Sequence, residues 1–180
     1  MDIIDINKLD TEQNTEENYE QISKTSQVSQ LINTWKSRLD WTSYFMSIAY
    51  LSASRSPCHR LQVGCVIVKD KRIVCTGYNG FLPDAPHESM IIDDHEQATI
   101  HAEQNSVSDC AKRGVSINGG IAYVTHFPCI NCFKILSASG IKTIIYGEDY
   151  RNLDLVYKLA EQTNITIKQY YSDENIPNNK

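Results

Sequence analysis

The sequence contains no hydrophobic run that approaches the roughly 20 residues needed to cross a membrane as a helix. It also has no excess of basic residues, because 17 Lys and Arg stand against 22 Asp and Glu. Nucleic-acid affinity rests mainly on Lys and Arg that neutralise phosphates, so this balance argues against a nucleic-acid partner. The N-terminus carries Asp2, Asp5 and Asp10 where a secretory signal has a basic start and an apolar stretch. We therefore expect a cytoplasmic protein with no membrane partner.

The length of 180 residues suits one domain of ordinary size. Residues 1–30 differ from the rest, because they have no apolar period and a surplus of Glu, Gln, Ser and Asn. Such a segment buries too little apolar surface to offset the entropy cost of ordering it. We expect an acidic, disordered tail there, with a tail that docks on a neighbouring subunit as the alternative. The domain should span residues 31–172, and residues 173–180 should fray.

Strand-like and helix-like segments alternate between these ends. Two β-branched runs, residues 62–68 and 72–78, flank Asp70 and Lys71, which predicts a β-hairpin. Further strands are expected at 121–124, 142–146 and 165–170, and helices at 31–53, 100–113, 129–138 and 153–162. This alternation predicts an α/β fold with parallel strand pairing in its second half. Residues 81–99 have no clear period, and loops of that length are usually functional or disordered.

Six cysteines in a compartment that keeps thiols reduced indicate metal ligands or buried thiols rather than disulfides. Cys129 and Cys132, at the start of a predicted helix, lie on one helix face, so both sulfurs can reach one metal. The helix N-terminus favours the thiolate, which is the ligand form. Taken alone, this pair also fits half of a structural zinc site, a redox pair or two buried thiols. The remaining cysteines at strand and helix positions are interpreted as packing residues: Cys65, Cys75 and Cys110.

His101 and Glu103 open the preceding predicted helix. A His/Cys/Cys ligand set leaves one tetrahedral position open, as catalytic zinc sites do. Glu103 is then placed to move the protons of a water molecule at that position. Alone, His101 is more often a surface or core histidine, and Glu103 is more often a solvated carboxylate favoured by the helix dipole. Together with Pro128–Cys132, they match the H-x-E…P-C-x-x-C pattern of the zinc nucleobase deaminases.

At these residues the chain resembles the cytidine deaminase-like superfamily, and within it the deoxycytidylate (dCMP) deaminases of the competence-operon and phage branch. The resemblance is carried by residues 55–68, 77–80, 101–105, 123–132 and 140–152. It implies a three-layer α/β fold, with a central mixed five-stranded sheet flanked by helices. It also implies zinc-dependent hydrolysis of dCMP to dUMP and ammonia, which supplies dUMP for thymidylate synthesis. By resemblance, His101, Cys129 and Cys132 bind zinc, and Glu103 is the catalytic proton carrier.

The resemblance further implies contacts with the nucleotide. Asn79 is expected to hydrogen-bond the sugar hydroxyl, and the backbone N–H of Ala102 the base carbonyl. Phe127 is expected to line the base pocket, and Tyr150 is expected to lie beside the ligand. Each side chain has a plainer alternative: Asn79 in a tight turn, Phe127 in the core, and Tyr150 on an ordinary loop.

The phosphate of such a substrate requires cations. Arg55 is the first candidate, and Arg60 and Arg151 are alternatives, although any single arginine is more often a solvated surface charge. Relatives also suggest a second, structural zinc held by Cys58, His87 and His95, with Glu88 and Glu96 standing where further cysteines are expected. Homo-oligomers (hexamer or dimer), dCTP and dTTP effectors, and Mg²⁺ with a nucleotide effector are implied by the same resemblance.

Two other functions fit parts of the sequence. A tRNA adenosine deaminase, or a deaminase of another nucleoside or nucleotide, would keep the chemistry and change the substrate. The acidic balance and the long insert between Asn79 and His101 argue against tRNA. A non-catalytic, zinc-stabilised binding module is the third interpretation, and Glu103 argues against it because a purely structural zinc site does not require that carboxylate.

Overall fold

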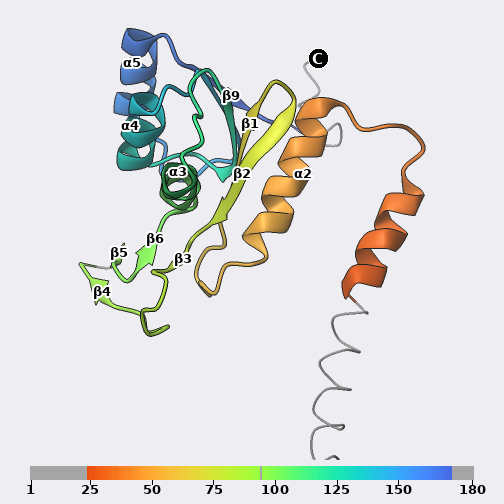
Figure 1. Ribbon diagram of the computed structural model, residues 1–180, viewed down its shortest axis with the longest axis horizontal. Helices are drawn as coiled ribbons and strands as arrows, with labels where there is room; N and C mark the ends of the chain where they lie inside the picture. The colour runs from red at the N-terminus through yellow and green to blue at the C-terminus, as the bar shows by residue number, and fades with distance from the viewer. Residues whose placement is uncertain (1–23, 94, 172–180) are drawn as a thin grey trace, which may run out of the picture. The chain divides into compact units, whose positions relative to one another are not determined.

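The computed structural model of the chain describes residues 24–93 and 95–171 (Figure 1). The predicted end over residues 173–180 and most of the predicted tail lie outside these ranges. The chain divides into two compact units, and the second begins at Asp40. In the first unit, residues 24–34 form a helix. None of the helices in the described ranges has the length and apolar character that a membrane span requires.

The apolar pattern over residues 31–53 belongs to two helices and not to one. The first ends at residue 34, and α2 (Trp41–Ala53) begins after Asp40. The Asp40 carboxylate accepts hydrogen bonds from the N–H groups of Thr42 (2.8 Å) and Ser43 (3.1 Å). An N-cap of this kind satisfies N–H groups that have no partner within the helix, so it favours a new helix start at this point.

A mixed five-stranded sheet forms the centre of the second unit, and this confirms the predicted fold class. Its strands are β1 (Gly64–Lys69), β2 (Arg72–Tyr78), β7 (Ile121–His126), β8 (Thr143–Glu148) and β9 (Thr166–Gln169). Their order is β2-β1-β7-β8-β9. Strand β1 is antiparallel to β2 and β7, whereas β7, β8 and β9 run parallel. Asp70 and Lys71 turn the hairpin with φ of 52° and 57°, as a tight two-residue turn requires.

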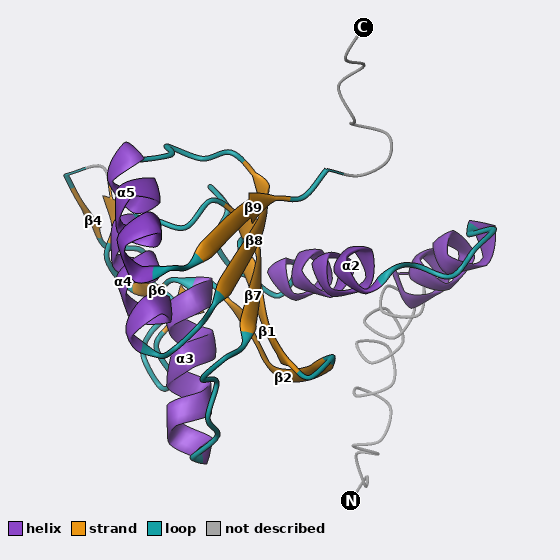
Figure 2. Cartoon of the chain, turned by 90° about the horizontal axis from the view of Figure 1, so that it is seen from above, coloured by secondary structure: helices purple, strands orange, loops and turns teal. Residues whose placement is uncertain are grey.

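Helices cover both faces of this sheet. Helix α2 packs on one face, and α3 (Ala102–Arg113), α4 (Ile130–Ala138) and α5 (Asp154–Thr163) lie on the other (Figure 2). Side chains alternate along β1, so Cys65 and Ile67 enter the core beneath α3, α4 and α5, while Val66 and Val68 enter the core beneath α2. Burial on both faces explains why this strand is an uninterrupted apolar run.

The segment without a clear sequence period contains short strand pairs. Strand β3 (Gly80–Phe81) pairs with β6 (Thr99–Ile100), and β4 (Ile91–Ile92) pairs with β5 (His95–Glu96). Within the segment, the Glu96 carboxylate accepts hydrogen bonds from the N–H groups of Met90 (3.1 Å) and Ala98 (2.8 Å). Pairs this short leave too few residues to establish a period, which is why the pattern missed them.

Helix α3 approaches β2 closely at Gly77. A Cβ atom at this position would lie 2.5 Å from the carbonyl oxygen of Ala102, which is backbone and cannot move independently. The first turn of α3 also carries Glu103 and follows His101 directly. The glycine therefore sets the distance between the sheet and the start of this helix.

Replacing Gly77 with alanine should lower the free energy of unfolding by about 1–3 kcal/mol, because overpacking forces the helix away from the sheet. Chemical denaturation measures this change. Gly80→Ala is the matched control, since its Cβ would meet only the Tyr78 ring and Pro57 at 3.3 Å or more. A Gly77→Ala protein as stable as the Gly80→Ala protein would contradict this account of the contact.

Candidate metal centre and active site

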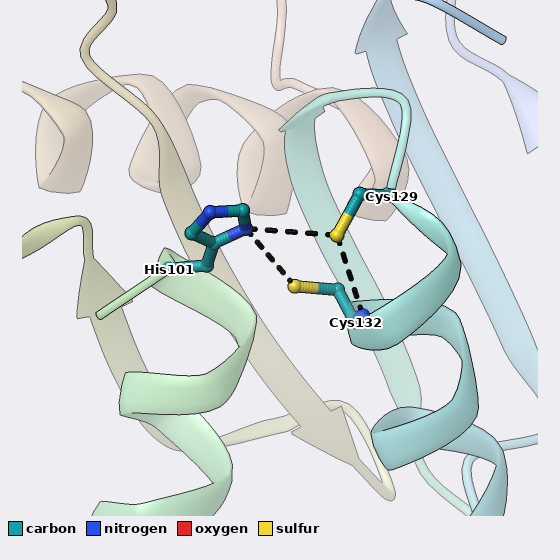
Figure 3. Close-up of side chains that lie close together, drawn as sticks. All are labelled: His101, Cys129 and Cys132. Atoms are coloured by element: carbon teal, nitrogen blue, oxygen red, sulfur yellow. Dashed lines mark hydrogen bonds between the residues drawn. The ribbon is translucent and has the colours of Figure 1, made fainter. Parts of the chain in front are cut away.

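Two helix N-termini bring His101, Cys129 and Cys132 together (Figure 3). His101 is the N-cap of α3, Cys129 is the N-cap of α4, and Cys132 lies in the first turn of α4. The Nδ1 atom of His101 lies 3.7 Å from the Cys129 sulfur and 3.4 Å from the Cys132 sulfur. His101 is exposed, Cys129 is half-buried and Cys132 is buried, so the group can be reached from one side.

These donors have the chemistry and the spacing of a zinc site. Tetrahedral zinc with bonds of about 2.3 Å to sulfur and about 2.0–2.1 Å to nitrogen separates those two atoms by about 3.5 Å. The Nδ1 to sulfur distances of 3.4 and 3.7 Å agree with that separation. Three protein donors leave a fourth tetrahedral position for a non-protein ligand.

The electrostatics of the two thiols favour a bound cation. A hydrogen bond from Cys132 lowers the pKa of Cys129 to about 4, although burial opposes the shift. The same hydrogen bond and burial raise the pKa of Cys132. The Cys129 sulfur also accepts the N–H of Cys132 (3.5 Å), as an N-cap does. One thiolate therefore already forms at neutral pH at the positive end of α4.

Glu103 lies beside the three donors and is only 4% exposed. Burial raises the pKa of its carboxyl group, because a charged carboxylate is costly away from water. Its own backbone N–H and the charge of His101 oppose that shift. A buried carboxyl group of raised pKa suits proton transfer.

A cavity of about 600 Å³ opens next to this group. Its lining includes His101, Glu103 and Cys129 together with most of the residues predicted to bind the nucleotide. The predicted nucleotide-binding residues in the lining are Asn79, Ala102, Phe127 and Tyr150. The volume is in the range of small-molecule sites, so a nucleotide is an occupant of suitable size.

The lining contains Arg60 and Arg151. Arg55, the first candidate for the phosphate, lies on the exposed turn after α2 and is not part of the described lining. The sequence pattern could not show which of the three arginines faces the cavity. Arg60 precedes β1 and Arg151 follows β8, so only the fold brings them to one cavity. The structure favours the two alternatives over Arg55 as residues that face the cavity.

Asn79 follows the last residue of β2, and its side chain hydrogen-bonds the segment that precedes β1. Its Oδ1 accepts the N–H of Val63 (2.8 Å), and its Nδ2 donates to the carbonyl of Leu61 (2.9 Å). Neither Asn79 nor Gly80 has the positive φ that a type I′ turn requires, so the plainer alternative does not describe this position. Each amide atom keeps one further hydrogen-bonding position, so a contact with a ligand remains chemically available.

Phe127 and Tyr150 occupy different environments. Phe127 is 4% exposed and packs against Tyr146 and Tyr157, with ring centroids 5.0 and 5.2 Å away. It therefore serves the core as well as the cavity wall. Tyr150 is half-buried in the loop after β8, and its ring lies edge-on to that of His126 at 6.2 Å.

The residues predicted for a second zinc are only partly described. Cys58 is half-buried and lines the cavity, whereas His87 stacks on Phe81 at 5.0 Å. His95 lies on β5, but its side chain is outside what the structure describes. Among the described side chains, neither Cys58 nor His87 joins a group of three metal-binding residues. The second zinc stays a prediction.

A second cluster of donors lies between β2 and α3. Cys75, Asp109 and Cys110 place their donor atoms within 4.8 Å of one another. Asp109, however, is paired with Arg113 at 2.7 Å, and the Arg113 guanidinium lies 3.9 Å from the Cys110 sulfur. A guanidinium already neutralises this cluster, and both thiols are buried in the core.

Sequence reasoning gave His126 no role, yet this residue lines the cavity. It is the last residue of β7 and is paired in register with Glu148 of the parallel strand β8. Ligands of α/β proteins commonly bind at the carboxyl ends of parallel strands. The position of His126 at a strand end was the available signal.

Comparisons with known proteins agree with this geometry. The family model for the cytidine and deoxycytidylate deaminase zinc-binding region matches residues 39–148. The chain belongs to this deaminase family. That match confirms the resemblance and, with the three converging donors, supports zinc as the metal.

Individual relatives of this deaminase differ in length. The ComE operon protein 2 of Bacillus subtilis (strain 168) is 45% identical over 143 residues, covering 77% of this chain and 76% of that protein. A deoxycytidylate deaminase of Saccharomyces cerevisiae is 33% identical, covering 74% of this chain and 46% of the yeast protein. Among solved structures, the dCMP deaminase of cyanophage S-TIM5 in complex with dCMP and dUMP has a TM-score of 0.66 and 29% identity. That match covers 74% of this chain and 99% of the phage protein.

Proposed function

We propose that this chain is a zinc-dependent deaminase that hydrolyses dCMP to dUMP and ammonia. The observation that carries the proposal is a buried carboxyl group, Glu103, next to three zinc-binding donors on the wall of a cavity of nucleotide size. The substrate assignment is supported by a relative named deoxycytidylate deaminase and by the phage enzyme that was crystallised with dCMP and dUMP.

His101, Cys129 and Cys132 would hold the metal in this proposal. Zinc, when bound there, would lower the pKa of a water molecule to about 7 and so supply a nucleophile at neutral pH. Glu103 accepts a proton from the attacking water and delivers it to N3 of the pyrimidine as C4 becomes tetrahedral. It then carries the second proton to the amino group, which leaves as ammonia.

The other lining residues position the nucleotide. Ala102 is fully buried at the start of α3, and its backbone N–H is one of the helix N–H groups without an intrahelical partner. This N–H would bind the base carbonyl, and Asn79 would bind the sugar hydroxyl. Phe127 and Tyr150 would contact the base. Arg60 and Arg151 line the same cavity and would supply positive charge near the phosphate.

Several finer expectations belong to the same proposal. We propose that the deaminase domain extends over residues 31–172 and acts in the cytoplasm as a homo-oligomer. Regulation by dCTP and dTTP, Mg²⁺ bound with a nucleotide effector, and a second zinc at Cys58, His87 and His95 are further parts of it. These features derive from the family resemblance.

Ammonia release from a panel of substrates tests the proposed function. The purified protein should release ammonia from dCMP. The alternative substrates in the panel are dCTP, deoxycytidine and adenosine-containing tRNA. Turnover of tRNA alone would overturn the substrate assignment. Full zinc content without ammonia from any substrate would instead favour a non-catalytic, zinc-stabilised module.

A further inference from the structure

We propose that His126 is a nucleotide-binding residue whose Nε2–H donates a hydrogen bond to the phosphate of the substrate. This inference rests on the proposed function of the cavity as a nucleotide site. It assigns a residue and an atom to a contact that the motif itself does not identify.

His126 lies at the carboxyl end of β7, the middle strand of the sheet. Strand β7 ends at His126, and the next residue, Phe127, donates its N–H to the Glu148 carbonyl at 2.9 Å. This pairing with β8 fixes the backbone at a point where both parallel strands end. His126 is half-buried. It lines the cavity together with Phe127 and Cys129.

Thr125 determines which ring nitrogen carries the proton. Its hydroxyl oxygen is fully buried, accepts the N–H of Gly64 at 3.1 Å and lies 2.9 Å from Nδ1 of His126. The hydroxyl proton needs an acceptor, because buried polar groups are hydrogen-bonded. Among the described residues, Nδ1 of His126 is the acceptor at hand. In a neutral imidazole with Nδ1 as acceptor, Nε2 carries the proton.

The ring is expected to be neutral in this position. Burial lowers the pKa of His126, because the charged form loses hydration, while the negative charge of Glu148 opposes the shift. The hydrogen-bond donor at Nε2 is present in either charge state, because imidazolium also carries that proton.

The Nε2 atom is available to a ligand. Thr125 is the one side-chain hydrogen-bond partner of the His126 ring within the described ranges. Every buried side-chain nitrogen or oxygen in the described residues has a hydrogen-bond partner. Because Nε2 of His126 has none, this atom is accessible to solvent. The cavity that His126 lines provides that access.

The neighbours of His126 favour the phosphate as its acceptor. Its ring meets the edge of Tyr150 at 6.2 Å, and the Arg151 guanidinium lies 5.7 Å from the centre of the Tyr150 ring. His126 contacts Tyr150, Tyr150 contacts Arg151, and all three residues line the cavity. An anionic phosphate binds best where N–H donors and a guanidinium converge.

Binding of the product and its dephosphorylated analogue tests this assignment. We would measure dissociation constants for dUMP and for deoxyuridine with wild type, His126→Leu and His126→Gln. The leucine variant should bind dUMP about 10- to 100-fold more weakly, the range for a lost hydrogen bond to a charged group, and deoxyuridine as wild type does. Glutamine places an amide N–H near the position of Nε2–H and should restore most of the affinity.

The outcomes separate this inference from the proposed function. The phosphate contact is overturned if His126→Leu binds dUMP and deoxyuridine more weakly by the same factor. It is also overturned if the variant binds dUMP as tightly as wild type does. Retained zinc content and an unchanged melting temperature show that each variant is folded. Wild type that binds dUMP but does not turn over dCMP overturns the deaminase proposal alone, whereas wild type that does not bind dUMP overturns both.

The ring proton can also be observed without any ligand. The ¹⁵N chemical shifts of the His126 imidazole at neutral pH should show a protonated Nε2 and an unprotonated Nδ1. The opposite tautomer would overturn the argument from Thr125. Thr125→Ser keeps the hydroxyl and should keep the same pair of shifts.

Discussion

Replacing Glu103 with glutamine should reduce the turnover number by about 10²- to 10⁴-fold, the usual contribution of a general acid–base group. Glutamine has nearly the same shape, so the site should stay intact, but an amide cannot accept a proton and pass it on. The carboxyl group is 4% exposed, and burial already raises its pKa. Removing a buried ionisable group should therefore leave the free energy of unfolding unchanged or raise it.

Three measurements distinguish this chemical role from a structural one. The zinc content of Glu103→Gln should equal that of wild type and its thermal stability should equal or exceed it, whereas the rate of dCMP deamination should fall. Glu161→Gln is the matched control, because Glu161 is exposed on α5 and lies outside the described lining of the cavity. A Glu103→Gln protein that holds zinc and keeps the wild-type rate would exclude Glu103 as the proton carrier.

The metal centre and the sheet could be predicted because their signals are local. Cys129 and Cys132 lie one helical turn apart, so their convergence follows from helix geometry. The hairpin of β1 and β2 followed from two apolar runs around Asp70 and Lys71. His101 joins the cysteines only through the packing of α3 beside α4, and it was identified by the family motif and not by spacing.

Features that depend on tertiary contacts were missed or left open. The apolar residues of 31–53 fit one helical period, but the Asp40 cap starts a new helix, and a period calculation does not detect caps. Arg55 and Arg151 are indistinguishable as sequence, and only the fold shows which one lines the cavity. The end of a predicted strand was the one signal for His126, because its ring is oriented by Thr125 and its surroundings come from the loop after β8.

Removing one zinc ligand should abolish activity and destabilise the chain. In Cys132→Ser, a hydroxyl replaces a buried thiol, and the remaining two donors leave the metal under-coordinated. We expect the bound zinc to fall by about one equivalent per chain and deamination to fall below detection, because no activated water is then supplied. If free zinc is at 100 times its dissociation constant, losing it costs about 2.7 kcal/mol of stability.

Cys110→Ala is the matched control for this prediction. Cys110 is another buried cysteine, on α3, but it lies in the second donor cluster beside Arg113. Its removal should cost some packing energy and leave the zinc content unchanged, as metal analysis of the purified proteins would show. If Cys110→Ala lost zinc and Cys132→Ser retained it, the metal would lie in the second donor cluster, which contains Cys110. That result would exclude the proposed site.

The same metal analysis tests the second zinc. If Cys58 is a ligand, wild type should contain about two equivalents of zinc and Cys58→Ser about one, with dCMP deamination retained at the remaining site. Cys132→Ser should then also retain about one equivalent, so a double variant should contain none. The opposite result is a wild type with one equivalent of zinc, which Cys58→Ser keeps and Cys132→Ser loses. One zinc bound by His101, Cys129 and Cys132 would then account for all the metal, and Cys58 would be excluded as a ligand.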